Sequence, residues 1–231
     1  KFLEILGAKN IKNYGNIKFS SVINSLNKEL DSSLLNKLRD RKVWCAASTH
    51  PTEELACAHS HLKIKKYYEN ILTIIIPRHV ERVQKINKEL LNLNLNVTLS
   101  SKADQLNSKT DILLVDSYGE TLKFYNISKY VFLGKSLIKS LINDSGQNPI
   151  EPAKLGCKIF HGPYTSNFIE IYEYLSSYGI TKKILDSNEL SISLVEDFKK
   201  DSSKNQEIIA KIENYGQNIF NNTIIEIKKY I

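Results

Sequence analysis

Methionine is absent from the 231 residues of this sequence, and cysteine and tryptophan are scarce, with three and one. Because no methionine stands at position 1, we expect a fragment or a processed chain. The cysteines, Cys45, Cys57 and Cys157, are odd in number and lack the spacing of metal ligands, which argues against a disulfide framework and a metal site. Cys45 and Cys157 lie in apolar, strand-like runs, so we expect buried free thiols in a reducing compartment.

Long hydrophobic runs are also missing. The longest, ILTIII at 71–76, is too short to span a bilayer, and no signal peptide is visible. The hydrophobic share of 42% is enough for a sizeable core, and the length suits one large α/β domain or two small ones. The net charge of +7 suits an anionic partner, but the lysines form no dense block, so we favour scattered surface charge over a nucleic-acid surface.

From residue 41 onward, apolar strand-like runs alternate with helix-like segments. This alternation predicts an α/β fold, a Rossmann-like parallel sheet with helices on both faces. The predicted strands are 42–48, 71–76, 96–100, 110–116, 129–134, 157–160 and 181–185. The predicted helices are 49–68, 80–90, 119–127, 148–156, 166–179, 188–200 and most of 205–230, with a weak point near Gly216.

The helix after the first strand carries N-terminal signals. Thr49 is a plausible N-cap and Pro51 suits the first turn, while Glu53 and Glu54 complement the positive end of the helix dipole. The periodicity predicts an inward face made of Leu55, Ala58, His59 and Leu62.

The first forty residues differ from the rest. Residues 15–20 resemble a short strand, and a polar lead-in follows at 27–41. We therefore expect an inter-domain segment at 1–40, a Rossmann-like domain at 41–204 and a C-terminal helical segment at 205–231.

Polar residues follow most of the predicted strands. In an open parallel sheet, ligands bind beyond the carboxyl ends of the strands, where helix N-termini offer amides suited to phosphate. The candidates are Ser48, Thr49 and His50; Pro77, Arg78 and His79; Ser117 to Glu120; Gly134, Lys135 and Ser136; Asn148 and Glu151; and His161 to Tyr164 with Asn167.

Taken singly, each candidate has an ordinary structural explanation. Arg78 suits a surface arginine, Gly119 a turn glycine, and Glu151 a dipole partner. The histidines suit caps or partly buried structural positions. The sequence has no Walker motif, no GxGxxG and no nucleophile elbow. The prediction of an anion site thus depends on several signals coinciding at one edge.

Six segments together resemble a known family. They are AASTHPTEE, IIIPRHVERV, DSYGETLKFY, VFLGKSL, GQNPIEPAKLG and HGPYTSNF, in the order and approximate spacing of the bacterial Kdo (3-deoxy-D-manno-octulosonic acid) transferases. These are inverting, metal-independent glycosyltransferases of the GT-B fold. They move Kdo from CMP-Kdo to a lipid A precursor at the cytoplasmic face of the inner membrane. The resemblance covers nearly the whole chain from GNIKF onward.

The resemblance implies that this chain is the C-terminal, CMP-sugar-binding half of a GT-B enzyme. The N-terminal acceptor domain, which in the family carries the membrane anchor, the acceptor site and the general base, is then absent. We expect the 231 residues to bind the donor without turnover, and to use neither a metal nor a cofactor. The expected partners are the CMP-sugar, the lipid A precursor and the inner membrane through the missing domain, and no nucleic acid.

The resemblance also assigns residues. Lys18 matches a lysine that stabilises charge in the transition state. The contacts to the CMP part are Pro77, Arg78, Tyr118, Gly119, Glu120, Asn148, Pro149, Ile150 and Glu151. Further candidates are Ser48, His50, His79, Gly134, Ser136 and Asn167.

Departures from the family pattern concern two histidines and one loop. Gln147 and Tyr164 stand where the family usually has histidine, and Lys135 where it has glycine. We hypothesise that Lys135 and Lys139 replace lost polar contacts. Two other functions stay open: another GT-B nucleotide-sugar transferase or an epimerase, and a non-catalytic binding module for nucleotide or nucleic acid.

Overall fold

The computed structural model describes residues 2–23, 29–200 and 206–230. Seven strands form one sheet in the order β3-β4-β2-β1-β5-β6-β7, and every neighbouring pair is parallel. The strands are β1 (Lys42–Thr49), β2 (Ile71–Pro77), β3 (Val97–Leu99), β4 (Ile112–Leu114), β5 (Tyr130–Leu133), β6 (Lys158–His161) and β7 (Thr181–Lys183). The predicted Rossmann-like sheet and all seven predicted strands are confirmed.

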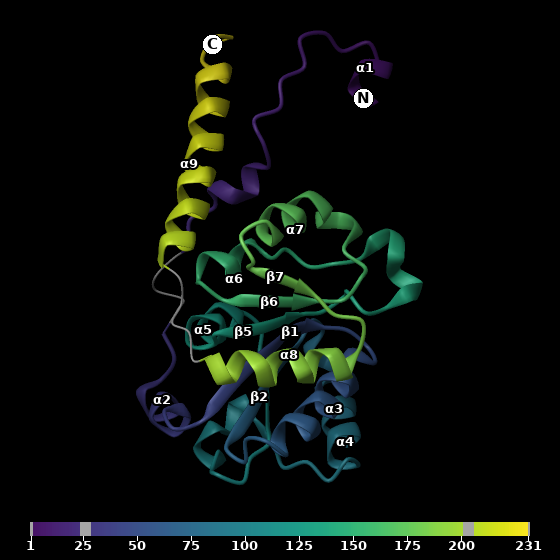
Figure 1. Ribbon diagram of the computed structural model, residues 1–231, viewed down its shortest axis with the longest axis vertical. Helices are drawn as coiled ribbons and strands as arrows, with labels where there is room; N and C mark the ends of the chain where they lie inside the picture. The colour runs from purple at the N-terminus through teal and green to yellow at the C-terminus, as the bar shows by residue number, and fades with distance from the viewer. Residues whose placement is uncertain (1, 24–28, 201–205, 231) are drawn as a thin grey trace.

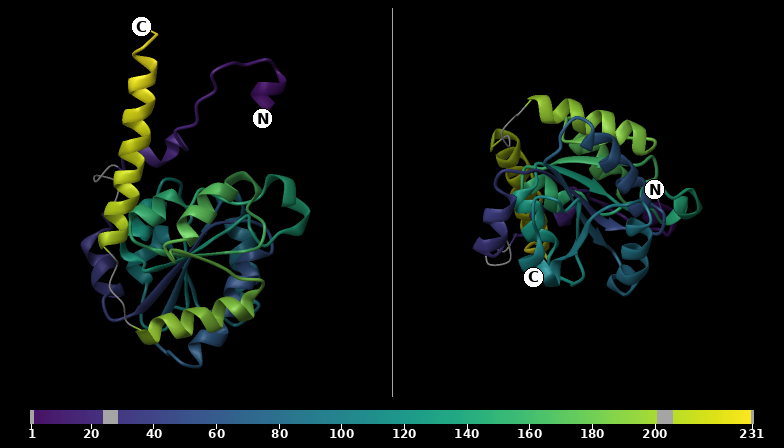
Figure 2. Two further views of the ribbon diagram at one scale, coloured as in Figure 1. Left: turned by 45° about the horizontal axis from the view of Figure 1, so that its top comes forward. Right: turned by 90° about the horizontal axis from the view of Figure 1, so that it is seen from below.

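Helices cover both faces of the sheet (Figures 1 and 2). One face packs against α2 (Ser32–Leu38), α5 (Thr121–Ile127), α6 (Ile150–Lys154), α7 (Ile169–Ser176) and the first half of α9 (Gln206–Ile227). The other packs against α3 (Glu53–Lys65), α4 (Val83–Leu91) and α8 (Ser187–Lys200). Short 3-10 segments lie at Ile17–Ser20, Val80–Arg82, Ser100–Gln105, Lys139–Asp144 and Ser166–Phe168, and the short α1 is Phe2–Ile5.

The central strands are apolar on both sides because both faces are covered. In β1, Trp44 and Ala46 join the core beneath α3 and α8, while Cys45 and Ala47 join the core on the other face. Cys45 and Cys157 are buried free thiols, as predicted, and so is Cys57, whose burial was not predicted.

The start of α3 corrects the sequence prediction. Thr49 is the last residue of β1 and not an N-cap; the N-cap position is Thr52, which has φ +82° and makes no side-chain cap bond. The inward face consists of Cys57, Ala58, Ser60, His61 and Ile64, whereas His59 is exposed. Of the predicted face, Ala58 is buried and Leu62 packs partly buried against the core, and the buried face also takes in Glu53 and Glu54 of the first turn.

Residues 15–20 are not a strand. Ile17–Ser20 form a 3-10 turn, with the side chain of Asn16 accepting the Lys18 amide, since no neighbouring strand is available for pairing. Phe19 is buried edge-on against Tyr174 of α7 and Tyr215 of α9. Residues 32–38, predicted only as a polar lead-in, form α2 with Asp31 as N-cap.

Helix α9 runs unbroken through Gly216, contrary to the predicted weak point. Gly216 faces the backbone of Phe19, where a side chain would not fit. Beyond this contact, α9 extends away from the sheet beside the N-terminal segment (Figure 1). The predicted boundary near 204–205, residues 24–28 of the first segment and the terminal residues 1 and 231 lie outside the described residues.

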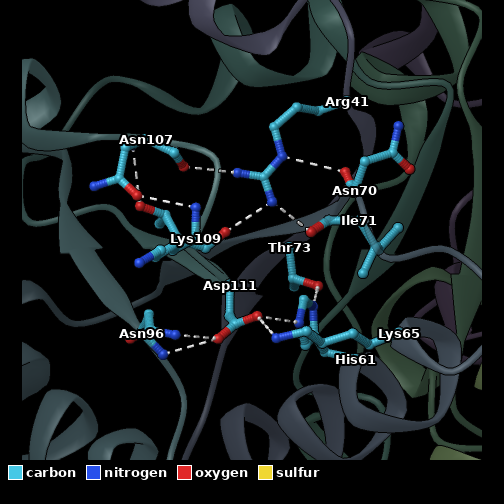
Figure 3. A network of polar contacts seen from close by, with 11 residues as sticks. Arg41, His61, Lys65, Asn70, Ile71, Thr73, Asn96, Asn107, Lys109 and Asp111 are labelled. Carbon is cyan, nitrogen blue, oxygen red and sulfur yellow. Dashed lines mark hydrogen bonds and ion pairs between the residues drawn. The ribbon is translucent and has the colours of Figure 1, made fainter.

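A polar network joins the amino ends of the strands (Figure 3). The guanidinium of Arg41 donates to four backbone carbonyls, those of Asn70, Ile71, Asn107 and Thr110. Nearby, the buried carboxylate of Asp111 accepts from His61, Lys65 and Asn96. This network lies opposite the edge where the predicted site residues collect. Within 2–23, 29–200 and 206–230, no helix combines the length and hydropathy that crossing a bilayer requires.

Candidate functional site

The strand order reverses between β1 and β5. The chain passes from β1 to β2 on one side and returns to β5 on the other, so the loops after β1 and β5 diverge at the carboxyl edge. Such a reversal is where open α/β sheets bind ligands. Because all seven strands are parallel, the predicted residues that follow them lie along this same edge.

Backbone strain concentrates at this reversal. Ser48, Thr52 and Lys135 adopt positive φ angles of +54°, +82° and +56° although none is a glycine. Ser48 also interrupts the pairing of β1 with β2, since the register shifts between Ala47 and Thr49. Positive φ in such residues costs free energy and is common in functional sites, which makes this edge the strongest candidate in the described chain.

Glu53 joins the two diverging loops. Its carboxylate is 1% exposed and accepts four backbone amides: those of His50 and Lys135 at 3.0 and 2.7 Å, and those of Ser136 and Leu137 at 2.9 and 3.0 Å. Burial raises the pKa of this carboxyl, although the amides favour its charged form.

Gly134 and Ser136 are packed into this junction. A Cβ on Gly134 would meet the Ser48 carbonyl and lie 2.7 Å from the Thr49 Cα. The buried Ser136 hydroxyl donates to the Leu133 carbonyl and accepts the Gly162 amide at 2.8 Å. These two candidates therefore hold the loops together, with no side-chain surface available to a ligand.

Cationic groups surround the junction. Arg78 is exposed directly after β2, and its amide donates to the Thr49 carbonyl at 3.0 Å. The ammonium of Lys135 lies 2.8 Å from Asp144, whose other oxygen accepts from the side chain of Asn167 at 2.7 Å. Lys139 is exposed on the same 3-10 segment as Asp144.

The histidines divide into an open pair and a buried one. The rings of His50 and His79 lie edge to face at 5.6 Å. Burial, and then the positive charges of His79, Lys135, Arg82 and Arg78, lower the pKa of His50 to about 4, so its ring is neutral at pH 7. Its Nε2 has no hydrogen-bond partner within the described residues.

His161 is the buried last residue of β6. Its Nδ1 contacts the Gly162 carbonyl at 2.7 Å, and burial lowers the pKa of His161 to about 4.

The loop after β4 is the most open part of the edge. Tyr118 is 69% exposed, and its hydroxyl donates to Glu81 at 2.9 Å. Gly119 has φ +83°, a conformation that suits glycine, and Glu120 occupies the N-cap position of α5, paired with Lys123 at 3.0 Å. Pro77, at the end of β2, is buried.

The segment 145–151 leads into α6. Asn148 accepts the Ile150 amide at 3.2 Å in a turn just before the short helix, whose N-cap position is Pro149; Pro149 and Ile150 are buried. Glu151 is exposed in the first turn. The Gly146 amide donates to the Lys135 carbonyl at 2.7 Å, which ties this segment to the loop after β5.

Lys18 comes from far away in the sequence to the same edge. Its ammonium lies 4.9 Å from the ring centre of Phe168, in the loop after β6. The neighbouring Asn167 donates its amide to the Ser145 carbonyl. The structure thus brings Lys18, the 145–151 segment and the loop after β6 together.

Sequence reasoning did not identify several polar groups here. Glu53 was predicted only as a dipole partner, and Arg82, which forms a two-point ion pair with buried Glu54, was not identified. Thr49 was among the strand-end candidates, and its hydroxyl is buried without a partner in the described chain. The signal available in the sequence was two consecutive glutamates, Glu53 and Glu54, four and five residues after the end of β1. Within the described ranges, no three His, Cys, Asp or Glu side chains gather as metal ligands.

Known proteins resemble the chain in sequence. It is 35% identical over 162 residues to the 3-deoxy-D-manno-octulosonic acid transferase of Haemophilus influenzae, covering 70% of this chain. The match spans only 37% of that relative. No protein-family model matches the chain.

Solved structures share the fold. The C-terminal CMP-Kdo binding domain of WaaA from Acinetobacter baumannii matches with a TM-score of 0.68 at 22% identity, over 89% of this chain and 99% of that one. A putative UDP-N-acetylglucosamine 2-epimerase from Listeria monocytogenes matches with a TM-score of 0.56 at 15% identity, over 96% of this chain and 54% of that one. The chain thus shares the GT-B glycosyltransferase-like Rossmann fold.

Proposed function

We propose, from the premise that the chain is homologous to the C-terminal domain of the Kdo transferases, that it binds the CMP part of CMP-Kdo. The observation that carries the proposal is the convergence of Arg78 with the Asn148–Glu151 segment and Lys18 at one sheet edge. A transferase for an anionic nucleotide-sugar needs such an edge.

In this proposal, different side chains bind different parts of the CMP-sugar. Arg78 pairs with the phosphate, whose charge grows as the bond to the sugar breaks. Exposed Glu151 accepts hydrogen bonds from the ribose hydroxyls, and Asn148 sets the start of the helix that carries it. Lys18 stabilises the negative charge that develops in the transition state.

The full reaction is proposed to be inverting, without a metal, on a lipid A precursor at the cytoplasmic face of the inner membrane. A single phosphate monoester leaving group carries less charge than a diphosphate, so cationic side chains suffice to stabilise it. The base that activates the acceptor hydroxyl is proposed to lie outside these 231 residues.

Calorimetric titration with CMP tests the binding proposal. We expect Arg78→Ala and Glu151→Ala each to weaken binding about 10-fold or more, since each removes a charge-assisted hydrogen bond of about 1.5–3 kcal/mol. Arg39→Ala and Glu69→Ala remove exposed charges of the same types at the opposite edge and should bind as wild type. Equal affinity in all five proteins would contradict the proposed site. Given CMP-Kdo and a lipid A precursor, the chain alone should give no transfer.

A second candidate is an enzyme of another nucleotide-sugar, favoured by the fold shared with the epimerase. The same titration with UDP separates the two. Binding of UDP tighter than CMP would favour the second candidate.

A further inference from the structure

Glu53 lies between the two parts of the proposed donor site. On one side is the end of β1, whose Thr49 carbonyl accepts the Arg78 amide at 3.0 Å. On the other is the loop after β5, whose Lys135 carbonyl accepts the Gly146 amide at 2.7 Å, two residues before Asn148. The side chain of Glu53 is 99% hidden from solvent by these loops.

Three of the amides that Glu53 accepts are consecutive. The N–H groups of Lys135, Ser136 and Leu137 converge on its two oxygens at 2.7–3.0 Å. Converging backbone amides of this kind form an anion-binding nest. Here an internal carboxylate fills the nest, so these three amides are not free to bind a donor phosphate.

The filled nest explains why a strained loop is stable. Lys135 keeps φ +56°, and Gly134 has no room for a side chain against Ser48, Thr49 and Glu53 itself. A buried carboxylate with four amide donors offsets that strain, because each hydrogen bond to a charged group contributes more than a neutral one. Without the carboxylate, all four amides would lose this acceptor, the buried Ser136 amide among them, and the loop would rearrange.

We propose that Glu53 is a positioning residue for the donor: as an internal anion it fixes the loop after β5 against the end of β1, and so sets the distance between Arg78 and the Asn148–Glu151 segment. This inference rests on the proposed function for its ligand. The residue itself makes no contact with the nucleotide.

Glu53→Gln tests the proposal with little change in side-chain size. The glutamine NH2 group faces amides that also donate, so at least one of the two oxygen positions can no longer accept. We expect CMP affinity to fall about 10-fold or more and the Lys135, Ser136 and Leu137 amides to lose protection from hydrogen exchange. Retained wild-type CMP affinity in this variant would overturn the proposal.

Asp197→Asn is the matched control. Asp197 is a buried carboxylate of α8, paired with Lys158 at 2.6 Å at the amino end of β6. Its substitution also removes a buried charge and should lower the melting temperature, yet leave CMP affinity unchanged. If both variants lost affinity in parallel with stability, the effect of Glu53 would be general destabilisation and the proposal would fail.

A measurement on the wild-type chain covers the case in which Glu53→Gln does not fold. In an NMR titration, the amide protons of Lys135, Ser136 and Leu137 should shift together, with one midpoint above the ordinary glutamate value of about 4.3. If the three amide protons shifted with different midpoints, or did not shift at all, Glu53 would not fix the loop after β5 and the proposal would be overturned. If wild type bound no CMP, the proposed function and the donor role would both fail, while the amide titration would still decide whether Glu53 holds the loop.

Discussion

Gly134 is a glycine because of its surroundings and not because of its backbone angles. A methyl group there would meet the Ser48 carbonyl, the Thr49 Cα at 2.7 Å and the Glu53 carboxylate at 2.8 Å. Two of these three neighbours are backbone at the end of β1, which cannot move without disturbing the sheet. The requirement for glycine thus comes from the contact between two strands that are far apart in sequence.

We therefore expect Gly134→Ala to destabilise the chain by about 1–3 kcal/mol, the usual cost of overpacking, which at this length corresponds to a fall of several degrees in melting temperature. Thermal unfolding measures it. Gly119→Ala is a useful comparison, since Gly119 has nothing within 4 Å and only its φ of +83° opposes a side chain. A Gly134→Ala protein as stable as wild type would refute the close approach.

Single polar residues could be predicted by type but not by partner. Arg78 and Glu151 are exposed at the carboxyl edge, as an ordinary strand-end argument predicts. The loop amides bound by Glu53 lie 82–84 residues away, so a local pattern could show only a dipole partner. Ser136 was predicted as a possible ligand contact, yet its hydroxyl is occupied within the fold.

At the scale of elements, α9 illustrates a conflict between propensity and packing. Glycine inside a helix costs about 1 kcal/mol relative to alanine, which made residue 216 look like a weak point. In the fold, Gly216 allows the backbone of Phe19 to approach, with the Phe19 carbonyl carbon only 2.6 Å from where a Cβ would lie. Packing of the Ile17–Ser20 turn thus outweighs helix propensity.

We expect Gly216→Ala to lower the melting temperature while leaving helix content by circular dichroism unchanged or slightly higher. The turn that carries Lys18 would be displaced from α9. Gln217→Ala, at the next and exposed position, removes only an exposed hydrogen bond to Asn221 while improving helix propensity, so it should be close to neutral. If Gly216→Ala raised the melting temperature, the close contact between Gly216 and the Phe19 backbone would not contribute to stability.

Elements were predicted best where burial is two-sided. Short continuous apolar runs rich in β-branched residues, such as Ile71–Pro77, favour strands in the interior of a covered sheet. The prediction failed at 15–20, where a short alternating run has no strand to pair with and forms a turn against α7 and α9.

At the scale of the whole molecule, the network at the amino edge makes stability depend on pH. Burial opposes the charge on Asp111, but hydrogen bonds from His61, Lys65 and Asn96 hold its pKa well below the usual value. A depressed carboxyl pKa contributes stability above about pH 4 that is lost as the pH falls. Burial also lowers the pKa of His61, so protonation of the unfolded chain below about pH 6.5 acts in the same direction.

We expect the free energy of unfolding in urea to fall steadily below pH 6. Asp111→Asn should cost about 2–3 kcal/mol at pH 7, since it removes hydrogen bonds to a buried charge, and should flatten the decline below pH 4. Asp116→Asn serves as comparison, because Asp116 accepts hydrogen bonds from Ser100 and Ser101 at the carboxyl edge, away from His61. This variant should leave unchanged the part of the pH dependence of unfolding that comes from His61. An Asp111→Asn curve parallel to wild type at all pH values would contradict the role of this carboxylate.

The sequence by itself determined the α/β class, the seven strands and the edge where polar residues gather, because apolar periodicity and residues following strands are local properties of the chain. Only the tertiary structure decided how that edge is built. The reversal between β1 and β5, the burial of Glu53 among loop amides, and the arrival of Lys18 beside Phe168 all join residues separated by 80 or more positions. Such contacts depend on strand order and on which carboxylate is enclosed, and neither is written in any single stretch of sequence.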